Sequence, residues 1–169
     1  SSLIRVELGS CGAVLGDTQV FNVLVTAHAI LMIFFMVMPL MVGGFGNWLF
    51  PLMLHCPDMA FPRLNNLSFW MLAVSLGLLS VSSVVGGGAG AGGTLSPPLA
   101  KSGYPPSCPT NLAILTLHAA GPSSIAGAII FMSTFKNYSA FGTRVKPTSL
   151  FPWSIFQTTI LPPLSLPGL

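Results

Sequence analysis

Four long apolar stretches, almost free of charged side chains, constrain this chain more than any other feature of its sequence. They cover residues 21–42, 67–85, 112–135 and 150–169. At a rise of 1.5 Å per residue, the first stretch would form a helix about 33 Å long, enough to cross a bilayer. The fourth is weaker because Pro162 and Pro163 are adjacent, so it should kink against neighbours or break. The pattern predicts an all-α integral membrane bundle of about four spans.

The composition argues against a water-soluble domain. Hydrophobic residues make up 52% of the chain and charged residues 5%, whereas a soluble domain carries about 25% charged residues. We therefore expect most of the surface to face lipid or apolar protein. No basic stripe with interleaved aromatic residues is present, so a nucleic-acid partner is not expected. Cys11, Cys56 and Cys108 have no metal-ligand spacing and are expected to be free thiols.

The ends and links of the chain indicate its wider organisation. It begins without a methionine and ends within an apolar stretch, so we expect part of a longer protein, with a partial span before residue 1. Residues 43–66 form a link rich in glycine, proline and asparagine, residues 86–110 predict a long loop of irregular backbone, and residues 136–149 form a short basic link. With four spans, one side would carry Arg5 and Lys101. The other would carry Arg63, Lys136, Arg144 and Lys146, and this bias places it on the cytoplasmic or matrix side.

Two histidines, His28 and His118, lie inside the predicted spans, where an imidazole is costly unless it has a partner. On an α-helix, the residues along the face of His28 would be Met32, Phe35, Met36 and Pro39. The ring could therefore ligate a metal beside a flat cofactor. It could also bond a carbonyl of another helix. In that case the methionine and phenylalanine side chains would serve ordinary helix packing, which is the commoner role of such a stripe. The same two alternatives apply to His118.

Asp58 lies at the predicted membrane edge, where it could be a proton entry point or the surface partner of Arg63. The nearby polar residues could order water or simply form a polar turn: Asn47, Asn65, Asn66 and Ser68. The sequence shows no Ser-His-Asp arrangement, zinc-protease motif or paired catalytic carboxylates. The glycines between residues 86 and 93 lack the lysine of a phosphate loop. Any catalysis would therefore depend on a bound cofactor.

Several motifs, in order and in spacing, resemble subunit I of the haem-copper oxidases, the cytochrome c oxidase subunit I family. The main run is HAILMIFFMVMP, from His28 to Pro39. It is accompanied by LIR at 3–5, EL at 7–8, GGFGNW at 43–48, PDMAFPRLNN at 57–66, SFW at 68–70, GAG at 88–90, PPL at 97–99, LH at 117–118, WS at 153–154 and LSLP at 164–167. The resemblance covers essentially the whole chain. It implies that residues 1–169 are a partial subunit I domain, from the end of the first to most of the fifth of twelve membrane helices.

The resemblance implies roles for ten residues. His28 matches an axial ligand of the low-spin haem a iron, and Arg5 matches the arginine that bonds the haem formyl group. Asp58 matches the mouth of a proton channel. Other polar positions in or near that channel are matched by Asn47, Asn65, Ser68, Ser123 and Ser124. Glu7 and Gly12 match positions near an outer cation site. In the family, the ligands of haem a3 and copper B lie beyond residue 169, so no catalytic residue is expected in this chain.

The resemblance also implies a function. The full subunit would transfer electrons from cytochrome c through haem to oxygen, with proton pumping, in the mitochondrial inner membrane. Its partners would be subunits II and III, with cytochrome c docking through subunit II. The alternatives are a non-catalytic membrane fragment or decayed copy of that subunit and, less favoured, a transporter in which His28 and His118 relay protons.

The chain departs from the family at several positions. Gly93 replaces a tryptophan that supports a haem propionate, within a run that reads GGTLS where the family has GWTVY. Ile130 stands where many members have an asparagine of the proton channel. Gly86 often corresponds to a glutamate, and His55-Cys56 replaces a Gly-Ala pair. Pro162-Pro163 interrupts a helix that the family keeps rich in leucine. These departures put haem support and the proton pathway in doubt.

Overall fold

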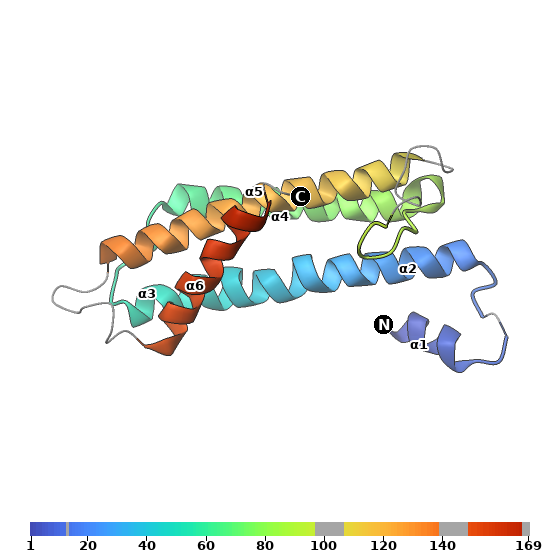
Figure 1. Ribbon diagram of the computed structural model, residues 1–169, viewed down its shortest axis with the longest axis horizontal. Coiled ribbons are helices and arrows are strands. Elements are labelled where there is room, and N and C mark those ends of the chain that lie inside the picture. The colour runs from blue at the N-terminus through green and yellow to red at the C-terminus, as the bar shows by residue number, and fades with distance from the viewer. Residues whose placement is uncertain (13, 97–106, 139–148, 167–169) are drawn as a thin grey trace. The chain divides into compact units, whose positions relative to one another are not determined.

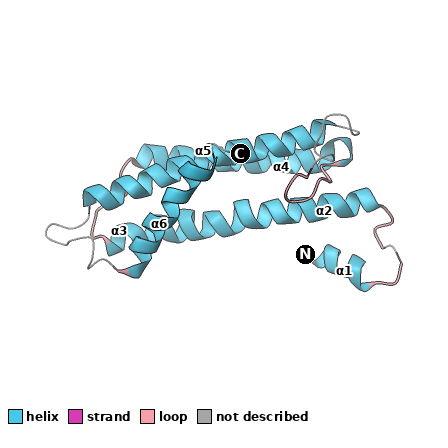
Figure 2. Ribbon diagram, in the orientation of Figure 1, coloured by secondary structure: helices cyan, strands magenta, loops and turns pink. Residues whose placement is uncertain are grey.

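The structure is a computed structural model that describes residues 1–12, 14–96, 107–138 and 149–166, and these contain helices but no strand (Figure 2). The α-helices are α1 (Ser2–Gly9), α2 (Thr18–Ile30), α3 (Asn47–Met53), α4 (Pro62–Val84), α5 (Ser107–Tyr138) and α6 (Leu150–Ser165). Two π-helices, η1 (Leu31–Val37) and η2 (Pro39–Gly46), follow α2, and the short 3₁₀-helix η3 (Val85–Gly87) follows α4. The predicted all-α class is confirmed.

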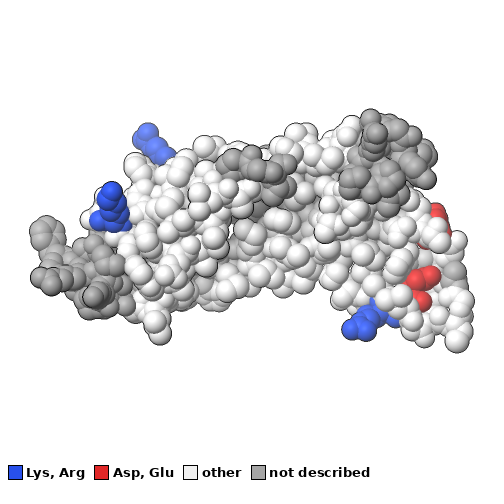
Figure 3. All heavy atoms as spheres, viewed as in Figure 1, with Lys and Arg blue, Asp and Glu red and all other residues white. Residues whose placement is uncertain are grey.

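Three helical segments are long and apolar enough to cross a membrane: Thr18–Met53, Pro62–Gly87 and Cys108–Asn137. They match the first three predicted stretches. The fourth corresponds to α6, which has 16 residues in the structure. On the face shown in Figure 3, large areas of the surface carry no charged side chain. This surface suits a lipid environment.

The described helices divide into two compact units, each considered by itself. The first unit combines Ser1–Met36 with Val74–His118, and the second combines Val37–Ala73 with Ala119–Leu169. Both α4 and α5 contribute a part to each unit. In the first unit, the hydroxyl of Ser75 on α4 donates to the carbonyl oxygen of Thr116 on α5 at 2.6 Å. Both residues are 0% exposed, so this bond ties the two helices together within the unit.

The second unit has an aromatic core. Its buried members are Phe50, Leu54, Met59, Ile130, Phe131, Phe135 and Ile155. The rings of Phe50 and Phe131 meet edge to face, with centroids 5.1 Å apart, and those of Phe135 and Phe156 stack at 4.5 Å. These are favourable aromatic geometries. They join α3, α5 and α6 around one apolar centre.

Residues 43–66, expected to form a loop between the first two spans, are mostly helical. Helical structure continues through η2 and α3 to Met53, and α4 begins at Pro62. The glycine signal has another physical origin at Gly46, which is buried. A Cβ atom there would lie 2.9 Å from Cζ of Phe131. The missing side chain therefore permits close packing between elements.

Two further local predictions change in the structure. The α-helical spacing used to align Met32 and Phe35 with His28 does not hold, because residues after Ile30 form π turns, which contain more residues per turn. In the fourth stretch, α6 continues through Pro162 and Pro163, so the helix does not break there. The carbonyl oxygen of Pro162 accepts the N–H of Leu166.

Some residues used in the sequence analysis lie outside the described residues: Pro97 to Leu99, Lys101, Arg144, Lys146 and Pro167.

Candidate functional site

His28 lies near the end of α2 and is half-buried. At 3.6 residues per turn, it is about 200° around the helix from Thr26. Thr26 and Ile30 are buried against the rest of the first unit, at 2% and 1% exposure. The imidazole therefore points away from the packed side of α2. Within the described part of the chain, no hydrogen bond to its ring is found, so a ring nitrogen is free to ligate a metal.

His118 differs from His28 in its surroundings. It is exposed on α5, and its Nδ1 lies 3.0 Å from the carbonyl oxygen of Ile114, four residues earlier on the same helix. An Nδ1–H tautomer satisfies this contact by donating to the carbonyl. The hydrogen-bond alternative thus holds for His118, but the partner belongs to its own helix and not to a neighbouring one.

Arg5 and Glu7 lie on α1, which contacts α2. The Arg5 side chain is exposed. Oε2 of Glu7 accepts the backbone N–H groups of Val14 at 3.0 Å and Leu15 at 2.8 Å. Gly12 lies between Glu7 and Val14 in the chain and has a φ of +97°, a backbone conformation that strongly favours glycine. Glu7 and Gly12 therefore belong to one turn, and the carboxylate orders its backbone.

Asp58 lies in the loop between α3 and α4 and is exposed, and its Oδ1 accepts the N–H of Met59 at 2.7 Å. The hydroxyl of Thr134 on α5 anchors the same loop by accepting the N–H of Ala60 at 2.9 Å. In this loop, burial raises the pKa of the Cys56 thiol. A backbone hydrogen bond lowers that pKa in part, and the negative charge of Asp58 raises it further. The loop thus presents an accessible carboxylate on a fixed backbone.

Asn47 and Asn65 are brought together in the second unit. Nδ2 of Asn47, at the start of α3, donates to Oδ1 of Asn65 on α4 at 3.1 Å. Oδ1 of Asn47 is buried, and no described residue forms a hydrogen bond with it. Buried polar groups of this kind are commonly satisfied by ordered water. The pair therefore provides a polar point inside an otherwise apolar region.

Ser68 and Ser123 are also brought together, through the backbone. The hydroxyl of Ser123 on α5 donates to the carbonyl oxygen of Ser68 on α4 at 2.7 Å. Ser124 instead donates to the carbonyl oxygen of Ala120 on its own helix, at 3.1 Å. The six predicted channel residues all belong to the second unit. Of these, the structure shows two direct pairings, whereas Asp58 and Ser124 bond only to nearby backbone.

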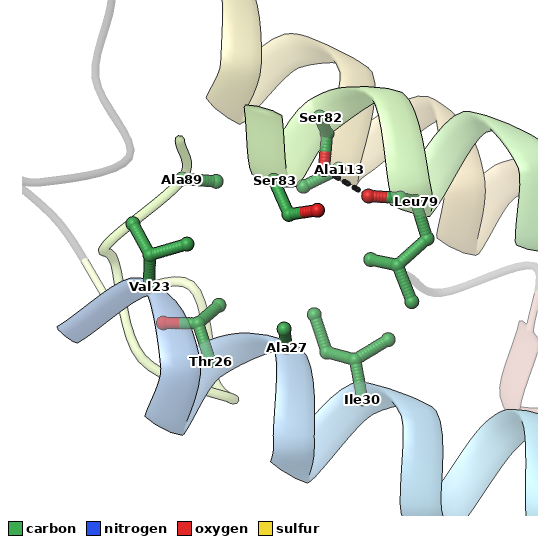
Figure 4. Close-up of a pocket in the computed structure, with 9 residues that line it drawn as sticks. All are labelled: Val23, Thr26, Ala27, Ile30, Leu79, Ser82, Ser83, Ala89 and Ala113. Carbon is green, nitrogen blue, oxygen red and sulfur yellow. Dashed lines mark hydrogen bonds between the residues drawn. The ribbon is translucent and has the colours of Figure 1, made fainter. Parts of the chain in front are cut away.

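A small cavity lies in the first unit, with a volume of about 10 Å³. Val23, Thr26, Ala27 and Ile30 of α2 line one side (Figure 4). The other lining residues are Leu79, Ser82, Ser83, Ala89 and Ala113. A cavity of this size holds at most about one water molecule. It lies on the side of α2 that carries Thr26, and it is far too small for a macrocycle.

The structure reveals three hydrogen bonds between separate segments that the sequence did not indicate. Thr134 holds the Asp58 loop, while Gln19 and Thr26 of α2 bond residues of the segment after η3. Each is a single polar residue within or beside an apolar stretch. That signal is weak because such hydroxyls often bond their own helix, as Ser124 does.

Comparison with known proteins matches the whole chain to one family. The family model for cytochrome c and quinol oxidase polypeptide I covers residues 1–169. The chain is 52% identical to cytochrome c oxidase subunit 1 of Yarrowia lipolytica, 46% to that of Candida albicans and 44% to that of Eremothecium gossypii. Each comparison covers 100% of this chain and 32% of the relative. The chain thus spans about a third of the length of these relatives.

Proposed function

Because this chain belongs to the cytochrome c and quinol oxidase polypeptide I family, we propose that it forms part of the catalytic subunit of a terminal respiratory oxidase. The subunit would pass electrons from cytochrome c through haem to oxygen and pump protons. Residues 1–169 would be a partial subunit I domain, from the end of the first helix through most of the fifth. The position of His28 is the main support for this proposal, because its imidazole lies on the side of α2 opposite to the one that packs into the first unit.

His28 would be one axial ligand of the haem a iron. The imidazole is half-buried, and the residues that pack α2 into its unit lie on the other side of the helix. A neutral imidazole is a suitable axial ligand, and a bound haem would supply reversible one-electron transfer. The opposite ligand, together with those of haem a3 and copper B, would come from the two thirds of the relatives that this chain does not span.

Arg5 would act on the same group from α1. Its guanidinium is exposed and carries several N–H donors in one plane. Donation to the haem formyl oxygen would stabilise electron density there and tune the potential. Glu7 and Gly12, which share a turn, would lie near an outer cation site. Since Oε2 of Glu7 is committed to two backbone N–H groups, its Oε1 would face the cation.

Asp58 would admit protons from the inner side. Its carboxylate is exposed on a loop held by Thr134. Asn47 and Asn65 would order the path beyond it, since Oδ1 of Asn47 is a buried acceptor that no donor of the described part of the chain reaches.

Ser68, Ser123 and Ser124 would line the path further on. The donor proton of Ser123 is committed to the carbonyl oxygen of Ser68, so Ser123 would serve as an acceptor along the path.

The assembly would lie in the mitochondrial inner membrane, surrounded by the lipid bilayer. Three segments long and apolar enough to span a membrane support this environment. Subunits II and III would be the neighbouring chains, with cytochrome c docking through subunit II.

The test is a reduced-minus-oxidised optical spectrum of the purified complex that contains this chain. His28→Ala should abolish the low-spin haem band. His118→Ala is the matched control, because His118 is also an intramembrane histidine but bonds its own helix, and it should leave the band in place. A band that survives His28→Ala would refute the ligand assignment.

A second candidate, a decayed and non-catalytic copy, is favoured by Ile130 and Gly93. Ile130 is 0% exposed within the apolar core, at a position where the resemblance implies a channel asparagine. Gly93 lacks the side chain that would support a propionate. Complete absence of a haem band from the wild-type complex, with the other subunits shown to be present, would establish this second candidate.

A further inference from the structure

Residues 88–93, here named the glycine strap, run along α2 in the first unit. Figure 1 shows this segment, in yellow-green, beside the first turns of α2. Two hydrogen bonds join them. Nε2 of Gln19 donates to the carbonyl oxygen of Gly88 at 3.2 Å, and the N–H of Gly92 donates to the hydroxyl oxygen of Thr26 at 3.0 Å. The strap is therefore attached to α2 at points two turns apart.

The glycines make this attachment close. A Cβ atom at Gly88 would lie 2.7 Å from a methyl group of Val23, and Gly88 also has a φ of +83°. A Cβ atom at Gly93 would lie 2.8 Å from Cβ of Ala29. These distances are shorter than any ordinary carbon contact. The backbone of the strap thus rests directly on α2, and the last contact is with the residue that follows His28.

Thr26 is the central residue of the attachment. Its side chain is 2% exposed. Its hydroxyl donates to the carbonyl oxygen of Asn22 at 2.7 Å while it accepts from Gly92. One buried hydroxyl therefore links the backbone of α2 to the backbone of the strap. Since Thr26 and His28 lie on opposite sides of α2, a shift of the helix at Thr26 moves the imidazole on the other side.

The structure beyond Ile30 explains why such an attachment matters. The α-helical ladder gives way to π turns in η1 at Leu31. Hydrogen bonds in π turns run between residues five apart, and such turns are often found at functional sites. The α-helical register at His28 thus ends within one turn on its C-terminal side. The contacts of the strap with α2 run from Gln19 to Ala29 and so end just before this change of register.

We propose that the glycine strap positions the His28 imidazole, with Thr26 as the positioning residue that couples strap and helix. This rests on the proposed function, in which His28 is an axial haem ligand. The strap fixes the height and rotation of α2, and these set the direction of the ring nitrogen toward the iron.

The first experiment compares Thr26→Val, Thr26→Ser and Thr116→Val in the assembled complex. Thr116 is a matched control, because it is 0% exposed and donates to the carbonyl oxygen of Leu112 in its own helix. Thr26→Val should shift the midpoint potential and the optical band of the low-spin haem. It should also speed hydrogen exchange at the Gly92 amide about three- to tenfold, the effect of losing one hydrogen bond. Thr26→Ser should restore both, and Thr116→Val should change neither.

The second experiment exchanges one methyl group between helix and strap. Gly93→Ala places a Cβ atom against Ala29 and should shift the haem potential, whereas Gly93→Ala combined with Ala29→Gly removes the collision and should return it towards the wild-type value. Ala29→Gly alone measures the separate effect of a glycine in α2. Gly127→Ala, with nothing within 4 Å of the added atom, controls for a glycine-to-alanine change elsewhere in the chain.

The outcomes separate this inference from the function on which it rests. If His28→Ala abolishes the low-spin band but Thr26→Val leaves potential, band and exchange as in Thr116→Val, the strap does not position the ligand. Faster exchange at Gly92 with an unchanged haem also overturns the inference, because the strap would then be only structural. If no low-spin band depends on His28, the proposed function itself fails.

Discussion

The side-chain amide of Asn47 donates to the side-chain carbonyl oxygen of Asn65 at 3.1 Å, while its own Oδ1 is buried and has no hydrogen-bond partner among the residues that the structure describes. The bond joins α3 to α4 through two side chains. Between these elements, the chain passes through the loop that carries Asp58. The pair therefore links the start of α3 to the first turn of α4 at a polar point inside the second unit.

The Asn47–Asn65 bond should be visible as an energetic coupling. We expect Asn47→Ala and Asn65→Ala to show a coupling energy of about 0.5–1.5 kcal/mol in a double-mutant cycle, because each variant removes the same bond. The measurement is the unfolding free energy of the purified complex for both single variants and the double variant. Strictly additive effects would show that the contact contributes nothing to stability.

Thr134 should matter more than its place in an apolar helix implies. Thr134→Val leaves the N–H of Ala60 unpaired while that residue remains 8% exposed. The expected cost is about 1–3 kcal/mol of unfolding free energy, with faster hydrogen exchange in the Asp58 loop. Thr159→Val is the control, because Thr159 is also buried, at 3% exposure against 0% for Thr134, and its hydroxyl donates to the carbonyl oxygen of Phe156 in its own helix. Equal effects of the two substitutions on loop exchange would contradict the anchoring role.

Gly46 should tolerate no side chain. Gly46→Ala brings a Cβ atom to 2.9 Å from Cζ of Phe131, and such overpacking typically costs about 1–3 kcal/mol. Gly43→Ala, in the same π-helix with nothing within 4 Å of the new atom, should cost far less. Thermal unfolding of the two variants makes the comparison. Adding Phe131→Leu to Gly46→Ala should relieve the collision, and a double variant no better than additive would contradict this account.

Ile130 should resist a return to the asparagine that the family resemblance implies. It is 0% exposed and packs in the cluster that contains Phe50 and Phe131. Ile130→Asn buries an amide among apolar groups, at an expected cost of about 2–5 kcal/mol. Ile130→Val, which removes one methylene group, should cost about 0.5–1.5 kcal/mol. An asparagine variant as stable as the wild type would mean that the surroundings already hold partners for a polar side chain.

The helices could be predicted from the sequence more readily than their ends. Long stretches almost free of charge allow few structures in a membrane, so the first three spans were found. The end of the first helix was missed because glycine and proline usually signal a loop. Gly46 is instead required by contact with Phe131, and Pro51 lies within α3. Contacts between segments distant in sequence decide both positions.

The candidate site divides in the same way. His28 could be identified because an imidazole is rare and costly in an apolar span. Thr26 and Thr134 could not, because a buried threonine that bonds its own helix, such as Thr116, has the same local signature. Only the fold shows that the hydroxyls of Thr26 and Thr134 also accept a backbone N–H from another segment. The proposed roles of His28, Arg5, Asp58, Glu7 and Gly12 remain predictions.

The thiol of Cys56 should ionise at a higher pH than an ordinary cysteine. Burial raises its pKa above 9.0, and the charge of Asp58 adds a smaller increase. Together these two effects outweigh a backbone hydrogen bond that lowers the pKa. The folded state therefore prefers the protonated thiol. This preference is fully present below the ordinary pKa and is lost as the pH rises through the folded value, so stability from this group should fall at high pH.

Alkylation of Cys56 measures the same shift. The assembled complex should carry Cys11→Ser and Cys108→Ser, which remove the two exposed thiols. Since the thiolate is the reactive form, the alkylation rate should continue to rise with pH beyond 9.0, and it should level off only at the raised pKa. Adding Cys56→Ser gives the background rate. A rate that levels off at or below the ordinary pKa would show that the thiol is not desolvated, and that the loop carrying Asp58 packs less closely against the aromatic core than the structure indicates.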